Sequence, residues 1–274
     1  MDVRTADRRP TLQDAPLLTE IDDAVAVLTL NRPESRNALS EAMLGALGDA
    51  LAKISQDRAV RAVVIAATGP AFSAGHDMKE LTARRSDPDG GRAYFKQLMS
   101  GCSAMMQMIV RLQQPVIAAV EGIASAAGCQ LVASCDLAVA SQAARFATPG
   151  VNIGLFCSTP MVALSRNVAP KHAMDMLLTG DPISAEDAFR IGLVNRVVPA
   201  GTARAEALAL AAKVASKARA VVKLGKEAFH RQAEMDLAGA YAYTAEIMAE
   251  NMMVRDAEEG LGAFIEKRAP RWET

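Results

Sequence analysis

The chain of 274 residues has the length of one large domain, or of one domain with a smaller appendage. Its 30 Lys and Arg against 31 Asp and Glu give a net charge of −1, which argues against general nucleic-acid binding. About half of the residues are hydrophobic (51%) but only 4% are aromatic, so Ala, Val, Leu and Met must fill the core. A polyanionic small molecule would bind only where a few Lys and Arg side chains gather.

The cysteines and the N-terminus bear on the compartment. Cys102, Cys129, Cys135 and Cys157 show neither C-x-x-C spacing nor a metal-site rhythm with histidine, so we expect free, buried thiols in a reducing compartment and no metal. No apolar stretch approaches the roughly 20 residues that cross a bilayer. Residues 1–16 form a polar lead-in without the apolar core of a secretory signal, and their acidic residues argue against a transit peptide. We therefore expect a cytoplasmic protein.

Strand and helix patterns alternate along the first two thirds of the chain. Strand patterns cover 17–21, 25–30, 62–67, 115–120, 137–140 and 194–198, and helix patterns cover 40–54, 78–85, 93–112 and 126–135. The alternation predicts an α/β fold with largely parallel pairing. Ser40 and Ser184 are expected to cap helices, and 85–92, rich in Asp, Gly and Pro, is the most disorder-prone internal stretch. Residues 202–268 read as helical, which predicts an α/β core over 1–200 and a helical region over 201–274.

Two turns crowded with small residues stand out because each follows a strand and precedes a helix. They are FSAGHD (72–77) and GIASAAGCQ (122–130). Backbone N–H groups at a helix start have no intrahelical partner and attract negative charge. Two such turns facing each other could hold a developing oxyanion, each donor contributing about 3 kcal/mol to the transition state. Taken separately, each is also explained as a tight α/β turn.

Read together, six strings resemble the crotonase superfamily, the enoyl-CoA hydratase/isomerase family, in family order over about residues 17–273. They are NRPESRNAL, GPAFSAGHDMKEL, PVIAAVEGIASAAGCQLVASCDLAVAS, ARFATPGVNIGL, PISAEDAFRIGLVNRVVP and GLGAFIEKRAPRW. The resemblance implies a ClpP-like spiral of ββα units. It also implies a C-terminal helical region that forms homotrimers, which often pair into homohexamers.

The resemblance also implies an oxyanion hole in a protein of the lyase and isomerase class that acts on acyl-CoA in fatty acid metabolism. The two donors would be the backbone N–H groups of His76, after the glycine of the A-G-x-D motif, and of Ala127, where the family commonly has glycine. Because both act through the backbone, their side chains do not disqualify them.

Contacts to coenzyme A carry over as well. Arg36 and Ala38 match the adenine-side loop, Ala74 lies in the first oxyanion turn, and Lys79 follows that turn. Lys267, with Arg268 beside it, matches a C-terminal helix that reaches the phosphates, sometimes those bound to a neighbouring subunit. Coenzyme A would arrive as part of the substrate, and no permanently bound cofactor or metal is implied.

The two glutamates that the hydratases of this family use to activate water and manage the α-proton are replaced. Their positions align with Gln130 and Gly150. An amide can orient a water but cannot exchange a proton usefully, and glycine has no side chain. This combination is most similar to one branch of the family, and it makes ordinary hydration doubtful.

Three readings stay open: a hydratase or isomerase with altered catalytic groups, a decarboxylase that needs only the oxyanion hole, and a non-catalytic acyl-CoA-binding or regulatory protein. FSAGHD resembles methylmalonyl-CoA decarboxylase and makes the His76 side chain a candidate acid or base. The tyrosine of that enzyme aligns near Cys157, which could instead line the acyl pocket. Asp77 is expected to be a helix cap.

Overall fold

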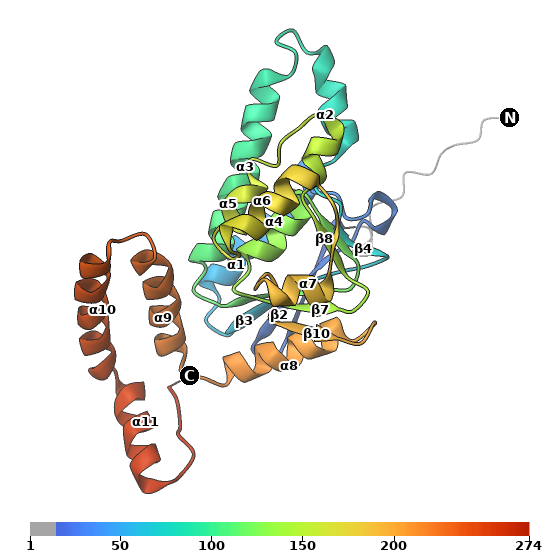
Figure 1. The fold of residues 1–274 in the computed structure, drawn as a ribbon. Helices are drawn as coiled ribbons and strands as arrows, with labels where there is room; N and C mark the ends of the chain where they lie inside the picture. The colour runs from blue at the N-terminus through green and yellow to red at the C-terminus, as the bar shows by residue number, and fades with distance from the viewer. Residues whose placement is uncertain (1–14, 274) are drawn as a thin grey trace, which may run out of the picture.

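A twisted six-stranded sheet forms the centre of the computed structural model, which describes residues 15–273 (Figure 1). Its order is β1 (Leu17–Asp22), β2 (Val25–Leu30), β3 (Ala62–Ala67), β5 (Val116–Val120), β7 (Leu137–Ser141) and β10 (Arg196–Val198). The ladders from β2 to β10 are parallel and β1 pairs antiparallel with β2. The predicted, largely parallel α/β core is confirmed.

Helices cover both faces of this sheet, which explains the uninterrupted apolar runs of its central strands. Leu28, Val63 and Ile65 belong to the larger core cluster, which also contains residues of α1 (Glu41–Gln56), α3 (Arg92–Arg111) and α4 (Ala127–Ser134). Alternate residues of the same strands, such as Val27 and Val64, pack with α8 (Ala203–Ala215) on the other face. The sheet is therefore the middle layer.

A second, four-stranded sheet was not predicted. Its order is β4 (Ala71–Ser73), β6 (Ile123–Ser125), β8 (Arg145–Ala147) and β9 (Ile183–Ser184). Each of the first three follows a strand of the large sheet, so β3–β4–α2, β5–β6–α4 and β7–β8–η4 repeat one unit. This repetition is the expected spiral of ββα units. Strands of two or three residues are too short to show an alternation in the sequence.

Shorter helices complete the body, and the predicted caps are present. They are α2 (Met78–Ala83), η4 (Pro149–Ile153), α5 (Pro160–Leu164), α6 (Pro170–Thr179) and α7 (Ala185–Arg190). The side chain of Ser40 accepts from Met43 N at 3.2 Å, and that of Ser184 from Asp187 N at 3.0 Å. The stretch 85–92 is not disordered: Asp89 accepts from the N–H groups of Gly91 and Ala93 and fixes the turn into α3.

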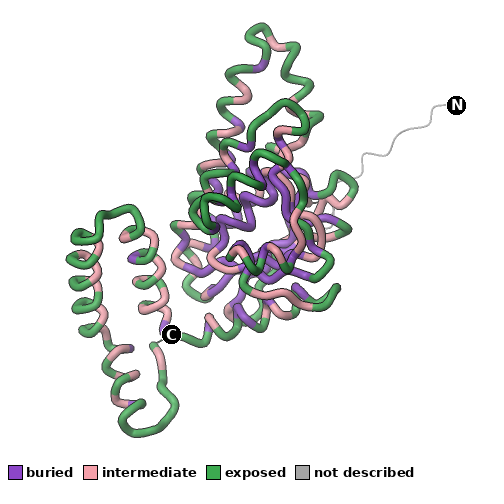
Figure 2. Tube along the Cα trace, viewed as in Figure 1, coloured by how far each residue is buried: buried purple, intermediate pink, exposed green. Residues whose placement is uncertain are grey.

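The helical region predicted over 201–274 divides in the structure. Helix α8 packs against β3, β5 and β7, whereas α9 (Arg219–Gln232), α10 (Leu237–Met252) and α11 (Arg255–Glu266) project as an arm (Figure 1). The body holds most of the buried chain, while the arm is largely exposed or half-buried (Figure 2). The predicted boundary at residue 200 therefore lies just before α8, and α8 packs against the sheet and not with the arm.

One buried ion pair joins the arm to the body. The ammonium of Lys226 in α9, whose side chain is 7% exposed, lies 2.7 Å from Asp136 Oδ2 and also donates to the carbonyls of Ile109 and Gln114. Asp136 in turn accepts from Val116 N at 2.7 Å.

None of the helices over residues 15–273 is long and apolar enough to span a membrane.

Candidate functional site

The two small-residue turns of the sequence are in contact. A β-carbon built on Gly75 would lie 3.0 Å from the β-carbon of Ala126 and 3.2 Å from the backbone nitrogen of Ala127. Gly75 has a φ of 91°, which glycine adopts without strain. At the next residue, a β-carbon on Gly128 would lie 2.3 Å from the carbonyl oxygen of Ser73, so α4 begins directly against the end of β4. Glycine at 75 and 128 is what lets the turns meet.

The backbone N–H groups of His76 and Ala127 lie on these adjoining turns. Ala127 is the first residue of α4, where an N–H has no intrahelical acceptor, and Gly75 precedes His76 directly. Within residues 15–273 neither N–H donates a hydrogen bond to another protein group. Each of the two adjoining turns therefore offers an uncommitted donor, and that of Ala127 lies at the start of a buried helix, where partial negative charge is favoured.

Backbone strain marks the residue between the two turns. Ala126 has φ 49° and ψ −116°, a conformation that L-residues rarely adopt. Its own N–H donates to the carbonyl of Ala147 at 2.9 Å, which ties the turn to β8. Such strain costs of order 1–3 kcal/mol and is concentrated at functional sites. Here it sets the direction of the following peptide, which carries the N–H of Ala127.

The His76 ring is held with one nitrogen unpaired. Nδ1 lies 3.3 Å from the carbonyl oxygen of Leu39, and because a carbonyl only accepts, the neutral ring carries its proton there. Nε2 is buried without a hydrogen-bond partner and so presents a lone pair. Burial lowers the pKa of His76, which the hydrogen bond to Leu39 offsets only in part. The neutral ring is an acceptor, and a bound carboxylate would find no donor there.

Two further buried polar atoms near the turns have no partner. Oε1 of Gln130, one turn into α4, and Oγ1 of Thr148, directly after β8, are both buried and unpaired. Gln130 is tied to the same turn, since its N–H donates to Ala126 O at 3.0 Å. Buried polar groups in native proteins nearly always have a protein or water partner, so each of these atoms is a place where a water or a polar ligand atom could bind. Thr148 was not singled out from the sequence, which carries no signal for it.

Gly150 lies buried in η4, and the space beside it is filled. A β-carbon there would lie 2.9 Å from Leu155 O and 3.0 Å from Cys157 Sγ. Burial raises the pKa of the Cys157 thiol and, with Cys157 nearby, raises that of Cys129 to about 12. All four cysteines are buried, free and therefore protonated thiols, as expected. The side chain of Cys157 therefore separates α4 from Gly150 and, as a protonated thiol, does not act as a nucleophile.

The residues expected at the adenine side lie next to the first turn. Arg36 O accepts from Ala74 N at 3.0 Å, and Leu39 N donates to Gly75 O at 2.7 Å, so the loop holding Arg36 and Ala38 runs alongside the turn that leads to His76. Asn37, missed in the sequence, locks this loop: its amide donates to Thr68 O and Ala71 O. A fully buried asparagine between two motifs has no sequence signature of its own.

Two cations that were expected to bind phosphate differ in position. Lys79, exposed at the start of α2, lies beside the site, because Asp77 caps that helix by accepting from Lys79 N at 2.8 Å. Lys267 follows α11 at the end of the arm, away from the turns (Figure 1). Arg268 is engaged by Glu259 and Glu266, and this pairing lowers the pKa of Glu259 to about 2. Within one chain, the structure does not bring Lys267 to the site.

The two sheets and the repeated ββα units define the class of protein by its spiral α/β core. The family model for enoyl-CoA hydratase/isomerase matches residues 20–274. The chain belongs to this family, whose members act on acyl-CoA thioesters, and the crotonase fold expected from the sequence is confirmed.

Individual relatives agree with that assignment. Enoyl-CoA hydratase domain-containing protein 3, mitochondrial, of Rattus norvegicus is 47% identical over 254 residues, 93% of this chain and 83% of the relative. A crystal structure of an enoyl-CoA hydratase from Mycobacterium smegmatis superposes with a TM-score of 0.90 at 54% identity, covering 94% of this chain and 99% of the other. The human domain-containing protein 3 structure gives 0.89 at 46%, covering 94% and 100%. Gln130 and Gly150 indicated one branch of the family in the sequence, and that branch is the one of the domain-containing protein 3 relatives.

The expected cytoplasmic location is wrong on this comparison. It rested on the acidic residues near the N-terminus, but similar relatives from four vertebrates are named mitochondrial. The first 14 residues, on which most of that argument depended, lie outside the described part of the chain. A few acidic side chains are too weak a criterion to exclude a targeting segment.

Proposed function

We propose that this protein binds an acyl-CoA thioester and stabilises the enolate of that thioester between the N–H groups of His76 and Ala127. The observation that supports the proposal is the close approach of Gly75 to Ala127, together with the absence of a protein acceptor for the N–H groups of His76 and Ala127. A preorganised donor pair in a water-poor site is worth far more than the same pair in water. The loop of Arg36 and Ala38 would hold the adenine side, next to Ala74 and Lys79.

Ordinary hydration is not the reaction that we propose. At the two glutamate positions the chain offers an amide and a glycine, and the wall beside Gly150 is a protonated thiol. Among the unpaired buried side-chain atoms of residues 15–273, Nε2 of His76 belongs to the single titratable base. We assign to its Nε2 the removal of a proton from the acyl α-carbon, because a neutral imidazole is a competent base near pH 7. The matching product would be an exchanged or isomerised thioester.

The second reading, decarboxylation, is less well supported by the geometry. A malonyl-type carboxylate would need donors, whereas burial keeps His76 neutral and its unpaired nitrogen is an acceptor. The third reading, a non-catalytic acyl-CoA-binding protein, shares the binding site and differs only in the absence of proton transfer. A homotrimer or homohexamer remains part of the proposal, supported by the exposed apolar side chains of the arm, including Phe229, Leu237 and Phe264.

Binding and hydration can be measured separately. Isothermal titration with butyryl-CoA should give saturable binding to the wild-type protein. Crotonyl-CoA hydration should be negligible in the wild type and should rise at least tenfold in Gln130→Glu, which restores one acid at nearly the same size, but not in the matched Gln130→Met. If the wild type hydrates crotonyl-CoA with a kcat of roughly 1–10³ s⁻¹, the range typical of enzymes, the proposal is contradicted. Absence of thioester binding would contradict it as well.

A further inference from the structure

The side chain of Gln130 is almost fully buried and makes no hydrogen bond. The residue is 4% exposed, and neither polar atom of its amide has a partner within residues 15–273. Oε1 is the amide atom that is both buried and unpaired, so Nε2, which is also unpaired, must reach open space. Because an amide nitrogen only donates, Gln130 holds a free hydrogen-bond donor within a buried helix.

The amide of Gln130 leans towards the first turn of α4. Gln130 and Ala127 are three residues apart and therefore share one face of this helix, whose side chains tilt towards its N-terminus. At that end the N–H of Ala127 has no acceptor, and Ala126 O fixes the turn by accepting from Gln130 N at 3.0 Å. One face of α4 thus carries a backbone donor and a side-chain donor, and the protein uses neither.

The spacing of these two donors suits two oxygens of one acyl chain. A helix rises 1.5 Å per residue, so Gln130 lies about 4.5 Å along the axis of α4 from Ala127. Oxygens on alternate carbons of a chain have a similar separation. When the oxygen of a bound thioester accepts from the N–H of Ala127, an oxygen on the β-carbon therefore comes within reach of Nε2 of Gln130.

The surroundings require that this second oxygen be neutral. Asp256, in the arm, is the single charged residue among the buried polar residues of 15–273, and those of the body, such as Ser73, Gln130 and Thr148, are all neutral. A carboxylate at this place would be buried without a cation, which is strongly unfavourable. A ketone or a hydroxyl oxygen needs only the one donor that Gln130 offers.

The proposed base selects between a ketone and a hydroxyl. The neutral imidazole of His76 is a weak base, and the proton beside a lone thioester carbonyl is only weakly acidic. A ketone on the β-carbon shares the negative charge of the enolate and makes that proton far more acidic, whereas a hydroxyl does not. The charge then lies on both oxygens at once, where the two donors of α4 stabilise it.

We propose, on the basis of the function proposed above, that the substrate is a 3-oxoacyl-CoA whose 3-oxo oxygen accepts a hydrogen bond from Nε2 of Gln130. The proton leaves C2 for Nε2 of His76, and the electron pair of the C–H bond spreads over the thioester oxygen and the 3-oxo oxygen. Return of the proton to C2 gives exchange, or inversion when C2 carries a substituent. No further reactant is needed.

The test compares four-carbon thioesters that differ at the third carbon. In isothermal titration at pH 7, wild-type protein should bind acetoacetyl-CoA at least tenfold more tightly than butyryl-CoA, the gain from one hydrogen bond to a partly charged oxygen. 3-Hydroxybutyryl-CoA should bind less tightly than acetoacetyl-CoA. The near-ultraviolet absorption of the conjugated enolate should rise when acetoacetyl-CoA binds, which reports the transfer of the proton directly.

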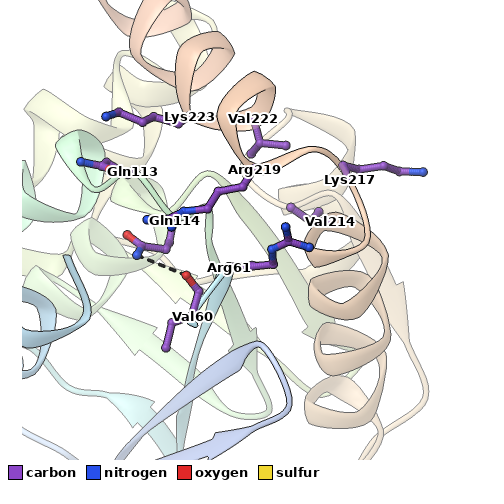
Figure 3. A pocket seen from close by; sticks show the side chains of 9 residues that line it. All are labelled: Val60, Arg61, Gln113, Gln114, Val214, Lys217, Arg219, Val222 and Lys223. Atoms are coloured by element: carbon purple, nitrogen blue, oxygen red, sulfur yellow. Dashed lines mark hydrogen bonds between the residues drawn. The ribbon is translucent and has the colours of Figure 1, made fainter. Parts of the chain in front are cut away.

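Two variants assign the preference to one donor. In Gln130→Met, which keeps the size of the side chain but removes the donor, the acetoacetyl-to-butyryl affinity ratio should fall to within threefold. Gln113→Met is the matched control, because Gln113 is half-buried and also has no side-chain hydrogen bond. It lines a small pocket that lies before β5 begins, whereas the turns follow that strand (Figure 3). Its ratio should match the wild type, and circular dichroism must show both variants folded.

Each of four results would overturn the proposal. They are equal affinities of the wild type for acetoacetyl-CoA and butyryl-CoA, tightest binding of 3-hydroxybutyryl-CoA, tighter binding of malonyl-CoA than of acetoacetyl-CoA, and a preference that survives Gln130→Met. The first three need no variant. Butyryl-CoA separates this inference from the proposed function: if it binds and the 3-oxo group adds nothing, only the inference fails, whereas absence of all thioester binding removes both.

Discussion

A β-carbon on Gly150 would lie 3.0 Å from the sulfur of Cys157, closer than such atoms normally approach. The glycine and the buried thiol therefore form one packing unit. The side chain of an acid at 150 would need space that Cys157 and the carbonyl of Leu155 already occupy. For this reason a glutamate at that position cannot be restored by a single substitution, and restoration of Gln130 alone is the cleaner experiment.

The first prediction concerns this pair. Gly150→Ala should lower the free energy of unfolding by about 1–3 kcal/mol through overpacking. In a Cys157→Ala background the cost should fall by at least about 0.5 kcal/mol, because one of the crowded contacts is gone while Leu155 remains. Urea denaturation of the four proteins measures the coupling. Strictly additive costs would show that the thiol does not restrict position 150.

The second prediction separates strain from access to the oxyanion hole. Gly75→Ala should reduce any reaction of the bound thioester by about 10²–10³, since its β-carbon would press on Ala126 and on the nitrogen of Ala127. Gly90→Ala is the matched control: Gly90 also has positive φ (67°), but nothing lies within 4 Å of its β-carbon position. Both should lose stability, and only the first should lose function. Similar activity in the two variants would remove Gly75 from the site.

The third prediction concerns the strained peptide. Ala126→Gly should raise the free energy of unfolding by about 1 kcal/mol, because relief of about 1–3 kcal/mol of strain exceeds the entropy cost of glycine. Ala52→Gly, at an exposed position inside α1, should instead lower it by about 1 kcal/mol. Thermal and urea unfolding of the wild type and of both variants measures the two changes. Destabilisation of both variants to the same extent would mean that position 126 carries no strain.

The fourth prediction is a pH dependence. Burial lowers the pKa of His76, so between its folded and unfolded pKa values the unfolded chain binds more protons. Its contribution to stability is complete above the unfolded value of about 6.5 and is lost as pH falls towards the folded value. His76→Gln should flatten the stability profile below about pH 6.5 relative to wild type. Parallel profiles for the two proteins would contradict a neutral, buried ring.

The fifth prediction concerns the anchor of the arm. Lys226→Met should cost about 3 kcal/mol or more, because it leaves the carboxylate of Asp136, whose side chain is 17% exposed, without its ammonium. Lys223→Met, one turn earlier and exposed, should cost less than about 0.5 kcal/mol. Chemical denaturation gives both values. Equal effects would show that the buried pair does not hold α9 to the body.

Much of the fold followed from the sequence because its signals are local. The apolar runs at β2, β3 and β5 and the caps at Ser40, Asp77 and Ser184 depend on residues a few positions apart. Elements that depend on partners distant in the sequence were not predicted. Strands β4, β6 and β8 exist only because they pair with one another, and η3 (Arg84–Ser86) with the Asp89 turn ordered a stretch whose composition favours disorder.

In the site too, features that depend on neighbouring residues could be predicted, and features that depend on residues distant in the sequence could not. The two turns could be identified because small residues follow strands, but their contact, and the unusual φ of Ala126, depend on packing between separate ββα units. The filled space beside Gly150 and the unpaired oxygen of Thr148 likewise follow from neighbours that are distant in sequence. The position of Lys267 away from the turns depends on how the arm leaves the body, which local sequence patterns do not specify.

The most direct measurement compares two reactions in the same preparation. In D₂O, wild-type protein should catalyse deuterium exchange at the α-carbon of butyryl-CoA, followed by NMR, while hydrating crotonyl-CoA negligibly. Exchange should fall at least 100-fold in Gly75→Ala and persist in Gly90→Ala. Rapid hydration without the need for a restored acid, or α-exchange no faster than in protein-free buffer, would contradict an enolate held by the N–H groups of His76 and Ala127.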